Sequence, residues 1–416
     1  MSVENLAPAR PPKKFHPDPF TYHQEIELSI DSLTNLGVGV GRIEGWVVFV
    51  PFALPEDTVR ARVYRNDKRH SEADLVEVLQ PSPHRVEPSC ELFGYCGGCQ
   101  YQHLSYEQQL HWKRKQVADL LKHMVKLEIE VAPVIHTEQT FGYRSKITPH
   151  FQKPRDGVIE TIGFLQVGRR RAALELDHCP IAMDSLNERL TSLKADTRAN
   201  AKRYKKGATI LLRASDGPEK VITDTKNICN QRVGELNFRF PAGDFFQNNP
   251  FILEAFTGYV RDEATAEESK FLVDAYCGSG LFCLTAAHAF EQAMGVEVSG
   301  ASIEWARNNA EANKITNATF IAGKSEALFP ECPFPGNETA MIVDPPRKGC
   351  DELFLNQLFA FGPKRVIYVS CNPATQMRDL NAFAQHGYQL TAMQPFDLFP
   401  QTRHLECVAT LVRTSE

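Results

Sequence analysis

Cys371 and Asp344 each follow a short apolar strand and lie in polar loops that contain proline. A strand at 341–343 leads into Asp-Pro-Pro-Arg-Lys-Gly, which begins at Asp344, and a strand at 365–369 leads into Ser-Cys-Asn-Pro, which contains Cys371. Loops at the carboxyl ends of parallel strands line the ligand crevice of an open sheet. We therefore expect Asp344 and Cys371 to face one site. A cysteine with polar neighbours on such a loop is better suited to be a nucleophile than to pack in a core.

A glycine turn at 274–280 predicts a second binding feature. The segment Asp-Ala-Tyr-Cys-Gly-Ser-Gly follows the apolar strand 271–275 and precedes an apolar helix, and a further strand ends near Glu297. Glycines let the backbone approach a nucleotide, and an acidic residue at this distance binds ribose hydroxyls. A single Asp-x-x-x-Gly-x-Gly turn is the form seen in S-adenosylmethionine-dependent methyltransferases, whereas dinucleotide-binding turns carry three glycines.

Four cysteines have a spacing that suits a metal centre. Cys90, Cys96 and Cys99 lie among glycines that let the backbone wrap tightly, and Cys179 precedes a proline further along the chain. Four thiolates suit zinc or an iron–sulfur cluster. Zinc ribbons usually pair two Cys-x2-Cys arms, and one such arm is present here, so we expect a [4Fe–4S] cluster. A fourth cysteine favours a structural role, or a role in RNA binding, over radical chemistry.

The composition is that of an ordinary globular protein, with 43% hydrophobic and 23% charged residues and a net charge of −5. At 416 residues the chain is long enough for two or three domains. It contains no run of about 18 apolar residues, so we expect no membrane span. Eleven cysteines without a secretion signal indicate a reducing compartment, and we expect a cytoplasmic location.

The elements that must position these residues fall into four regions. Residues 1–20 are expected to be a disordered tail, and short, closely spaced strands at 21–82 predict a five-stranded barrel of OB type. Residues 83–240 are expected to form a central α+β domain that holds the cysteines. Strands alternate with helices in 241–416, which predicts an α/β domain of Rossmann type with a parallel sheet.

Basic residues of the first 270 positions predict a phosphate-binding surface. Arg60, Arg62 and Tyr64 share one face of an alternating strand, which fits a solvated face and an RNA-binding face equally well. Further basic residues lie on the expected surface of the helix 104–126 and in two later clusters: Lys113, Arg114, Lys115 and Lys122; Arg169, Arg170 and Arg171; Lys202, Arg203, Lys205 and Lys206.

Taken in chain order, these motifs resemble the RNA uracil-5-methyltransferase family. Besides the segments at 274–280, 344–349 and 370–373, the chain carries Phe-Phe-Gln-Asn-Asn-Pro at 245–250 and His-Leu-Glu at 404–406. The barrel resembles the TRAM domain of that family, and the four cysteines resemble its iron–sulfur branch. The resemblance covers nearly the whole chain after residue 20. It implies methyl transfer from S-adenosylmethionine to C5 of a specific uridine in ribosomal or transfer RNA.

The resemblance also implies roles for six residues. Cys371 is expected to be the nucleophile and Glu406 the base that removes the C5 proton, and four residues are expected to contact S-adenosylmethionine: Gln247, Tyr276, Glu297 and Asp344. Two places depart from the family. Leu281 replaces an asparagine found in some members, and Gly323-Lys324-Ser325 replaces a more acidic or amide-bearing stretch near the adenine. Cofactor contacts at Leu281 and Lys324 are therefore left open.

The chemistry of uracil explains these residue types. C5 is too weak a nucleophile to take a methyl group from a sulfonium, but a thiolate that adds to C6 turns the ring into an enolate with a nucleophilic C5. After methyl transfer the C5 proton must leave so that Cys371 can be eliminated, and a carboxylate suits that step. A free thiol has a pKa of roughly 8.5, so Cys371 needs a lowered pKa or a nearby base.

Two other functions fit parts of the sequence. An RNA cytosine-5-methyltransferase would carry a second cysteine in a Pro-Cys motif on the loop that begins at Asp344, where this chain has no cysteine until Cys350. An RNA-binding protein with an inactive methyltransferase domain would not need Cys371, Glu406 and Asp344. The sequence leaves open which RNA and which uridine are modified, and we expect a monomer.

Overall fold

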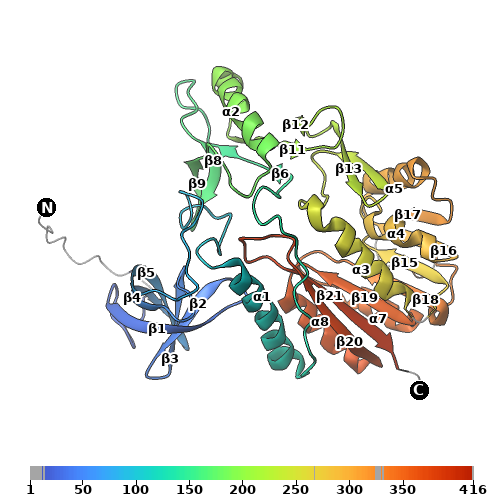
Figure 1. Ribbon diagram of the computed structural model, residues 1–416, viewed down its shortest axis with the longest axis horizontal. Helices are drawn as coiled ribbons and strands as arrows, with labels where there is room; N and C mark the ends of the chain where they lie inside the picture. Colours follow the sequence, from blue (N-terminus) through green and yellow to red (C-terminus); the bar gives the residue numbers. More distant parts are fainter. Residues whose placement is uncertain (1–11, 13–14, 267, 324–328, 330–331, 415–416) are drawn as a thin grey trace, which may run out of the picture. The chain divides into compact units, whose positions relative to one another are not determined.

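The computed structural model describes residues 12, 15–266, 268–323, 329 and 332–414, without the side chains of 169–171 (Figure 1). Most of the tail predicted at 1–20 lies outside these residues, as does Lys324. The chain divides into two compact units. The first comprises the residues up to Gly94, Gly98–Trp112 and Gln401–Arg403, and the second comprises Tyr95–Gly97, Lys113–Pro400 and the residues from His404 onward.

The first unit contains a closed barrel of five strands in the order β1-β2-β3-β5-β4. Its strands are β1 (Glu25–Leu33), β2 (Val38–Ile43), β3 (Trp46–Pro51), β4 (Thr58–Asn66) and β5 (His70–Gln80). Every second residue of β4 from Val59 to Val63 points into the barrel, where Val59, Ala61 and Val63 are fully buried. Closure leaves no free strand edge. The predicted five-stranded barrel is confirmed.

The positive charges on the outer face of β4 are neutralised by acidic side chains of the same barrel. Arg60 forms ion pairs with two glutamates at 2.9 and 2.7 Å, and Arg62 pairs with a third at 2.7 Å. The Tyr64 hydroxyl donates to Glu72 at 2.9 Å. Of the two interpretations that the sequence left open for this face, these contacts favour a solvated, charge-balanced surface over a phosphate-binding one.

The predicted basic surface of the helix 104–126 is only partly present. The structure has helix α1 (Tyr106–Leu120) here, and it continues into the π-helical turn η1 (Leu121–Val125). Lys113 is fully buried, because it lies on the same helix face as the buried Gln109 and Val117. Its ammonium group binds the Asp397 carboxylate at 2.7 Å. The other three basic residues of this stretch each pair with a carboxylate: Arg114 with Glu130, Lys115 with Asp119, and Lys122 with Glu128. The prediction that Lys113 lies on the surface is wrong.

The central part of the second unit is α+β, as expected from the sequence. Helix α2 (Asp184–Ala199) and the 3₁₀ turn η2 (Ala201–Arg203) accompany short antiparallel strands. A four-stranded sheet has the order β10-β7-β8-β9, a three-stranded sheet the order β12-β11-β6, and β13 pairs with β14. These strands are β6 (Lys146–Ile147), β7 (His150–Phe151), β8 (Ile162–Gln166), β9 (Arg169–Glu175), β10 (Ala208–Thr209), β11 (Leu212–Ala214), β12 (Val221–Ile222), β13 (Ile228–Val233) and β14 (Leu236–Pro241).

A seven-stranded sheet in the order β17-β16-β15-β18-β19-β21-β20 carries the functional motifs (Figure 1). Its strands are β15 (Phe271–Ala275), β16 (Gln292–Glu297), β17 (Ala318–Ala322), β18 (Thr339–Val343), β19 (Arg365–Ser370), β20 (Tyr388–Phe396) and β21 (Glu406–Arg413). The first five in this order are parallel, whereas β21 is antiparallel to both β19 and β20. The chain order reverses between β15 and β18, which creates a crevice at their carboxyl ends. The predicted fold of Rossmann type is confirmed.

Helices precede the first strand of this sheet and connect the strands that follow, up to β20. They are α3 (Leu253–Thr265), preceded by η3 (Pro250–Ile252), then α4 (Leu281–Ala286), η4 (Ala287–Ala289), α5 (Gly300–Ala312), η6 (Gly336–Glu338), α7 (Glu352–Phe361) and α8 (Pro373–Gln385). Leu272, Ile342 and Ile367 of the sheet pack with Phe256 of α3 and Leu284 of α4 in one apolar cluster. Among the residues that the structure describes, every helix is too short or too polar to cross a bilayer.

Candidate active site at the carboxyl ends of the parallel strands

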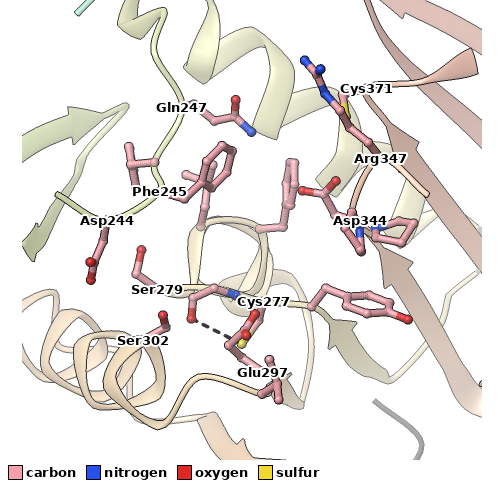
Figure 2. Close-up of a pocket in the computed structure, with 18 of the residues that line it drawn as sticks. Asp244, Phe245, Gln247, Cys277, Ser279, Glu297, Ser302, Asp344, Arg347 and Cys371 are labelled. Carbon is pink, nitrogen blue, oxygen red and sulfur yellow. Dashed lines mark hydrogen bonds between the residues drawn. The ribbon is translucent and has the colours of Figure 1, made fainter. Parts of the chain in front are cut away.

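A cavity of about 620 Å³ opens where β15, β16, β18 and β19 end (Figure 2). It lies within the second unit. Its walls contain all six residues to which the sequence assigned catalytic or cofactor roles: Gln247, Tyr276, Glu297, Asp344, Cys371 and Glu406. In Figure 2 Gln247, Asp344 and Cys371 lie towards one end of the cavity, and Ser279, Ser302 and Glu297 lie towards the other.

The glycine turn between β15 and α4 forms one wall of the cavity. Gly278 and Gly280 have φ values of 55° and 92°, and Tyr276 has a φ of 73°. Residues other than glycine rarely adopt this left-handed backbone conformation, so Tyr276 is held in it by its surroundings. The backbone N–H groups of Tyr276 and Cys277 both donate to the Val296 carbonyl at 3.0 Å. This pairing holds the turn against β16, and its residues from Tyr276 to Ser279 line the cavity.

Glu297, at the end of β16, is oriented by two backbone groups. Its carboxylate accepts hydrogen bonds from Gly278 N–H at 3.3 Å and from Ser299 N–H at 2.9 Å (Figure 2 marks one of these bonds). These bonds hold the carboxylate beside the glycine turn, where the acidic residue of a nucleotide-binding fold meets ribose hydroxyls.

Asp274 links β15 to the helix that follows the glycine turn. The sequence analysis assigned this residue no role of its own. The side chain is fully buried, and its Oδ2 accepts a hydrogen bond from Cys283 N–H at 2.9 Å in α4. Burial raises the pKa of this carboxyl well above its usual range, and the neighbouring Asp344 adds to the shift. Asp274 therefore ties the end of β15 to the helix that follows the glycine turn.

The other end of the cavity combines a thiol with two carboxyl groups. Asp344 follows β18, Cys371 follows β19 and Glu406 begins β21. Because Ser370 of β19 is paired with Cys407 of β21, the sheet brings Cys371 beside Glu406. Burial raises the pKa of Asp344 to about 7 and that of Glu406 well above its usual range. Burial, together with the negative charges of Glu406 and Asp344, also raises the pKa of Cys371 to about 11.

Arg347 brings positive charge to this group, and the sequence interpretation gave it no role. Its guanidinium lowers the pKa values of Cys371 and Glu406 and so opposes the effect of burial. Its backbone carbonyl accepts hydrogen bonds from Asn372 Nδ2 and Thr375 Oγ1, both at 3.1 Å. The signal was present in the Asp-Pro-Pro-Arg motif, which places a cation on the same loop as Asp344.

Phe245 is a second lining residue that sequence reasoning missed. Phe245 as a whole residue is 78% exposed, whereas the neighbouring Phe246 is buried and stacks on Phe240 with ring centroids 4.2 Å apart. An exposed aromatic side chain at a pocket is suited to stack on an unpaired base. Of the two positions where cofactor contacts were left open, Leu281 lines the cavity and Lys324 lies outside the described residues.

The four cysteines predicted to bind a cluster are divided between the units. Cys90 and Cys99 belong to the first unit, and Cys96 and Cys179 belong to the second. In the part of the chain that the structure describes, no three His, Cys, Asp or Glu side chains are grouped so that they could hold a metal ion. The [4Fe–4S] cluster stays a prediction of the sequence.

Comparisons with known proteins agree with this architecture. Residues 209–330 and 337–414 match the family model of tRNA (uracil-5-)-methyltransferases, and residues 20–76 match that of the TRAM domain. A Schizosaccharomyces pombe protein named tRNA (uracil(54)-C(5))-methyltransferase is 42% identical over 95% of this chain and 79% of its own length. A Saccharomyces cerevisiae protein of the same name is 35% identical over 94% of this chain and 74% of its own.

A solved structure has the same fold over most of the chain. It is the Pyrococcus abyssi tRNA (uracil-54, C5)-methyltransferase in complex with S-adenosyl-L-homocysteine, which is 24% identical and has a TM-score of 0.71. The match covers 93% of this chain and 100% of the other. Since the S. pombe relative shares 42% of its residues over most of both proteins, this chain belongs to the tRNA (uracil-5-)-methyltransferase family.

Proposed function

We propose that the protein transfers a methyl group from S-adenosylmethionine to C5 of a uridine in transfer RNA. One observation carries the proposal: Cys371 and Glu406, at adjacent ends of the neighbouring strands β19 and β21, line the same cavity as the glycine turn and Glu297. The names of the two yeast relatives support transfer RNA, and uridine 54 in it, as the substrate. The Pyrococcus structure contains S-adenosylhomocysteine, the product that remains after methyl transfer, which supports the cofactor.

The cofactor end of the cavity is proposed to bind S-adenosylmethionine through four residues. Glu297 would accept hydrogen bonds from the ribose, and Tyr276 would contact the cofactor at the glycine turn. Gln247 and Asp344, which Figure 2 shows towards the end with Cys371, would contact the part of the cofactor nearest the reacting base. When bound, S-adenosylmethionine supplies an electrophilic methyl group.

The reaction end is proposed to work through a covalent bond between Cys371 and the base. The thiolate electron pair forms a bond from Sγ to C6 of uracil, which makes C5 nucleophilic and lets it take the methyl group. The Glu406 carboxylate then removes the C5 proton, and the electrons of that C–H bond restore the C5–C6 double bond and expel the thiolate. A buried carboxylate with a raised pKa is a stronger base than an exposed one, which suits this step.

A direct test supplies the purified protein with unmodified tRNA transcript and S-adenosylmethionine labelled in its methyl group. We expect the label in 5-methyluridine at position 54, located by mass mapping of nuclease fragments, and no transfer of label when ribosomal RNA is supplied instead of tRNA. Label in 5-methylcytidine would support the cytosine-5 alternative. Binding of tRNA without transfer of label would support an inactive RNA-binding protein.

A patch of basic side chains in the second unit is proposed to bind the RNA backbone. The basic patch consists of Lys153, Arg155, Lys202, Arg203, Lys205 and Lys206. All six are exposed, and none forms a salt bridge with an acidic residue in the described part of the chain. The segment 153–157 lies next to the segment 202–206, since a Cβ added at Gly157 would lie 3.2 Å from Lys202 Cγ. Unpaired cations gathered in this way suit a phosphate backbone better than the compensated arginines of β4.

Reversing the charge of Lys202, Arg203, Lys205 and Lys206 to glutamate should weaken tRNA binding by at least about tenfold near 0.1 M salt. Each lost phosphate contact lowers the salt dependence of the binding constant by about one unit of slope. Affinity for S-adenosylmethionine should not change, because these residues do not line the cavity. Fluorescence anisotropy with labelled tRNA measures the first quantity, and calorimetry the second.

Matched controls are Arg114→Glu and Lys122→Glu, which reverse charges that already face a carboxylate. They should weaken tRNA binding less than two reversals within the basic patch. Unchanged tRNA affinity in the fourfold variant would make the patch an ordinary solvated surface.

We also propose, from the spacing of the cysteines and their glycine neighbours, that Cys90, Cys96, Cys99 and Cys179 bind a [4Fe–4S] cluster. Protein purified without oxygen should then be brown and contain about four iron atoms per chain. Cys179→Ala should lose the iron, whereas Cys332→Ala should keep it. Colourless protein with one zinc ion, or with no metal, would contradict the cluster.

A further inference from the structure

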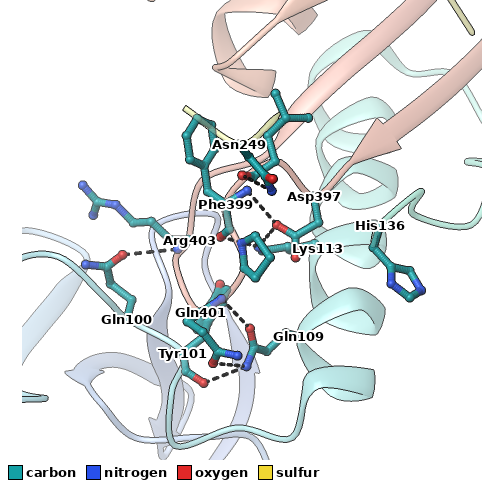
Figure 3. A network of polar contacts seen from close by, with 12 residues as sticks. Gln100, Tyr101, Gln109, Lys113, His136, Asn249, Asp397, Phe399, Gln401 and Arg403 are labelled. Atoms are coloured by element: carbon teal, nitrogen blue, oxygen red, sulfur yellow. Dashed lines mark hydrogen bonds and ion pairs between the residues drawn. The ribbon is translucent and has the colours of Figure 1, made fainter. Parts of the chain in front are cut away.

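The loop between β20 and β21 is held by buried polar contacts along its first four residues (Figure 3). This loop ends at Glu406, the first residue of β21, which is paired with Phe396 at the end of β20. Lys113 of α1 is fully buried, and its ammonium donates to Asp397 Oδ1 at 2.7 Å and to the Phe399 carbonyl at 3.4 Å. One lysine therefore binds both ends of the first turn of the loop.

Three further contacts hold the same four residues. The Asp397 N–H donates to the Ile135 carbonyl at 2.8 Å. Asn249 Nδ2 donates to the Leu398 carbonyl at 3.1 Å, and the Tyr143 hydroxyl donates to the Pro400 carbonyl at 2.9 Å. Asn249 and Tyr143 are fully buried, as are Lys113 and Asp397. Each residue from 397 to 400 is therefore fixed by a group from a distant part of the second unit.

Stability alone does not account for a charged pair at this position. Burial lowers the pKa of Lys113, and the Asp397 carboxylate opposes that shift. Moving a lysine and an aspartate out of water costs so much that a well-packed apolar pair of similar size is often as stable or more so. An apolar pair, however, could not bind the Phe399 carbonyl or keep the bond from Phe399 N–H to Asp397 Oδ1 at 3.2 Å. The ionic pair specifies the shape of the loop.

We propose that Lys113 is a positioning residue for Glu406: by binding Asp397 and Phe399 it fixes the loop that places the base in the cavity. A base must lie within about 2.6–3.2 Å of the proton that it removes, and an error of about 1 Å can cost about a hundredfold in rate. Asn249 links the same loop to the segment that carries Gln247. This inference rests on the proposed function and assigns a role that the motifs do not contain.

The test is Lys113→Met, which keeps the length of the side chain but removes its charge. Turnover should fall about tenfold to a hundredfold, with little change in KM for S-adenosylmethionine. The loss should fall on the last step, so methylated RNA–protein adduct should accumulate in single-turnover reactions. Lys115→Met is the matched control, because it makes the same change on the same helix at an exposed pair with Asp119. It should turn over normally and form no excess adduct.

A second variant separates positioning from stability. Lys113→Met with Asp397→Leu removes both charges, so the folded state should recover much of the stability that the single change loses, as measured by thermal unfolding. Elimination should remain slow, since the loop has still lost the contacts made by the Lys113 and Asp397 side chains. Normal turnover in this double variant, or a single variant whose formation and elimination of adduct slow equally, would overturn the proposal. Glu406→Gln is the reference: if it traps no adduct, the role of Glu406 as the base in the proposed function fails, and if it alone traps adduct, only the role of Lys113 fails.

Discussion

Glu406→Gln should stop the reaction after methyl transfer and leave methylated tRNA covalently attached to the protein. The amide has nearly the shape of the carboxylate but cannot accept the C5 proton, so Cys371 can add and cannot be eliminated. Loss of a general base lowers turnover by about 10²–10⁴-fold. The adduct should appear as a slow band on a denaturing gel. The uracil in this adduct should carry the methyl group only when S-adenosylmethionine is present.

The chain offers a direct control for this result. Adding Cys371→Ala to Glu406→Gln should abolish the band, because the covalent bond is made by that sulfur. Release of 5-methyluridine at the normal rate by Glu406→Gln would show that another group removes the proton, even though Glu406 lines the cavity.

Cys371→Ala should abolish methyl transfer, with a loss of about 10⁴-fold or more, as expected when a covalent nucleophile is removed. Binding of S-adenosylmethionine should persist, since the glycine turn and Glu297 are unchanged.

In the native protein the rate of adduct formation should rise between pH 6 and pH 9. The reason is that the pKa of Cys371 is raised to about 11, so the fraction of reactive thiolate grows throughout this range.

Cys332→Ala is the matched control for this prediction. Cys332 does not line the cavity, and its replacement should leave the rate and its pH dependence as they are. Methyl transfer by Cys371→Ala at more than a few per cent of the native rate would exclude the covalent mechanism, although the fold and family would stand.

The sequence by itself determined the fold class and predicted that Asp344 and Cys371 face one site. Strand period, helix period and turn residues are local signals, and they located the barrel and the alternating strands and helices correctly. The rule that ligands bind at the carboxyl ends of parallel strands then places Asp344 and Cys371 at the same site. Neither step needed knowledge of which distant elements touch.

Only the tertiary structure decided what depends on neighbours from elsewhere in the chain. Helical spacing showed a basic helix, but the burial of Lys113 against Asp397, 284 positions away, has no local signal. An alternating strand placed Arg60 on an outer face, but the pairing of strands supplied the glutamates that neutralise it.

The position of Glu406 is the clearest case of this kind. Glu406 lies beside Cys371 because β21 is inserted between β19 and β20. Strand β21 is antiparallel to both neighbours and interrupts the chain order of the sheet. A strand carries the same period-two pattern whichever partner it takes, because its backbone groups are alike at every position. Strand order is settled by long-range packing, and this is why Glu406 could be proposed as the base from its motif although its position is set only by the fold.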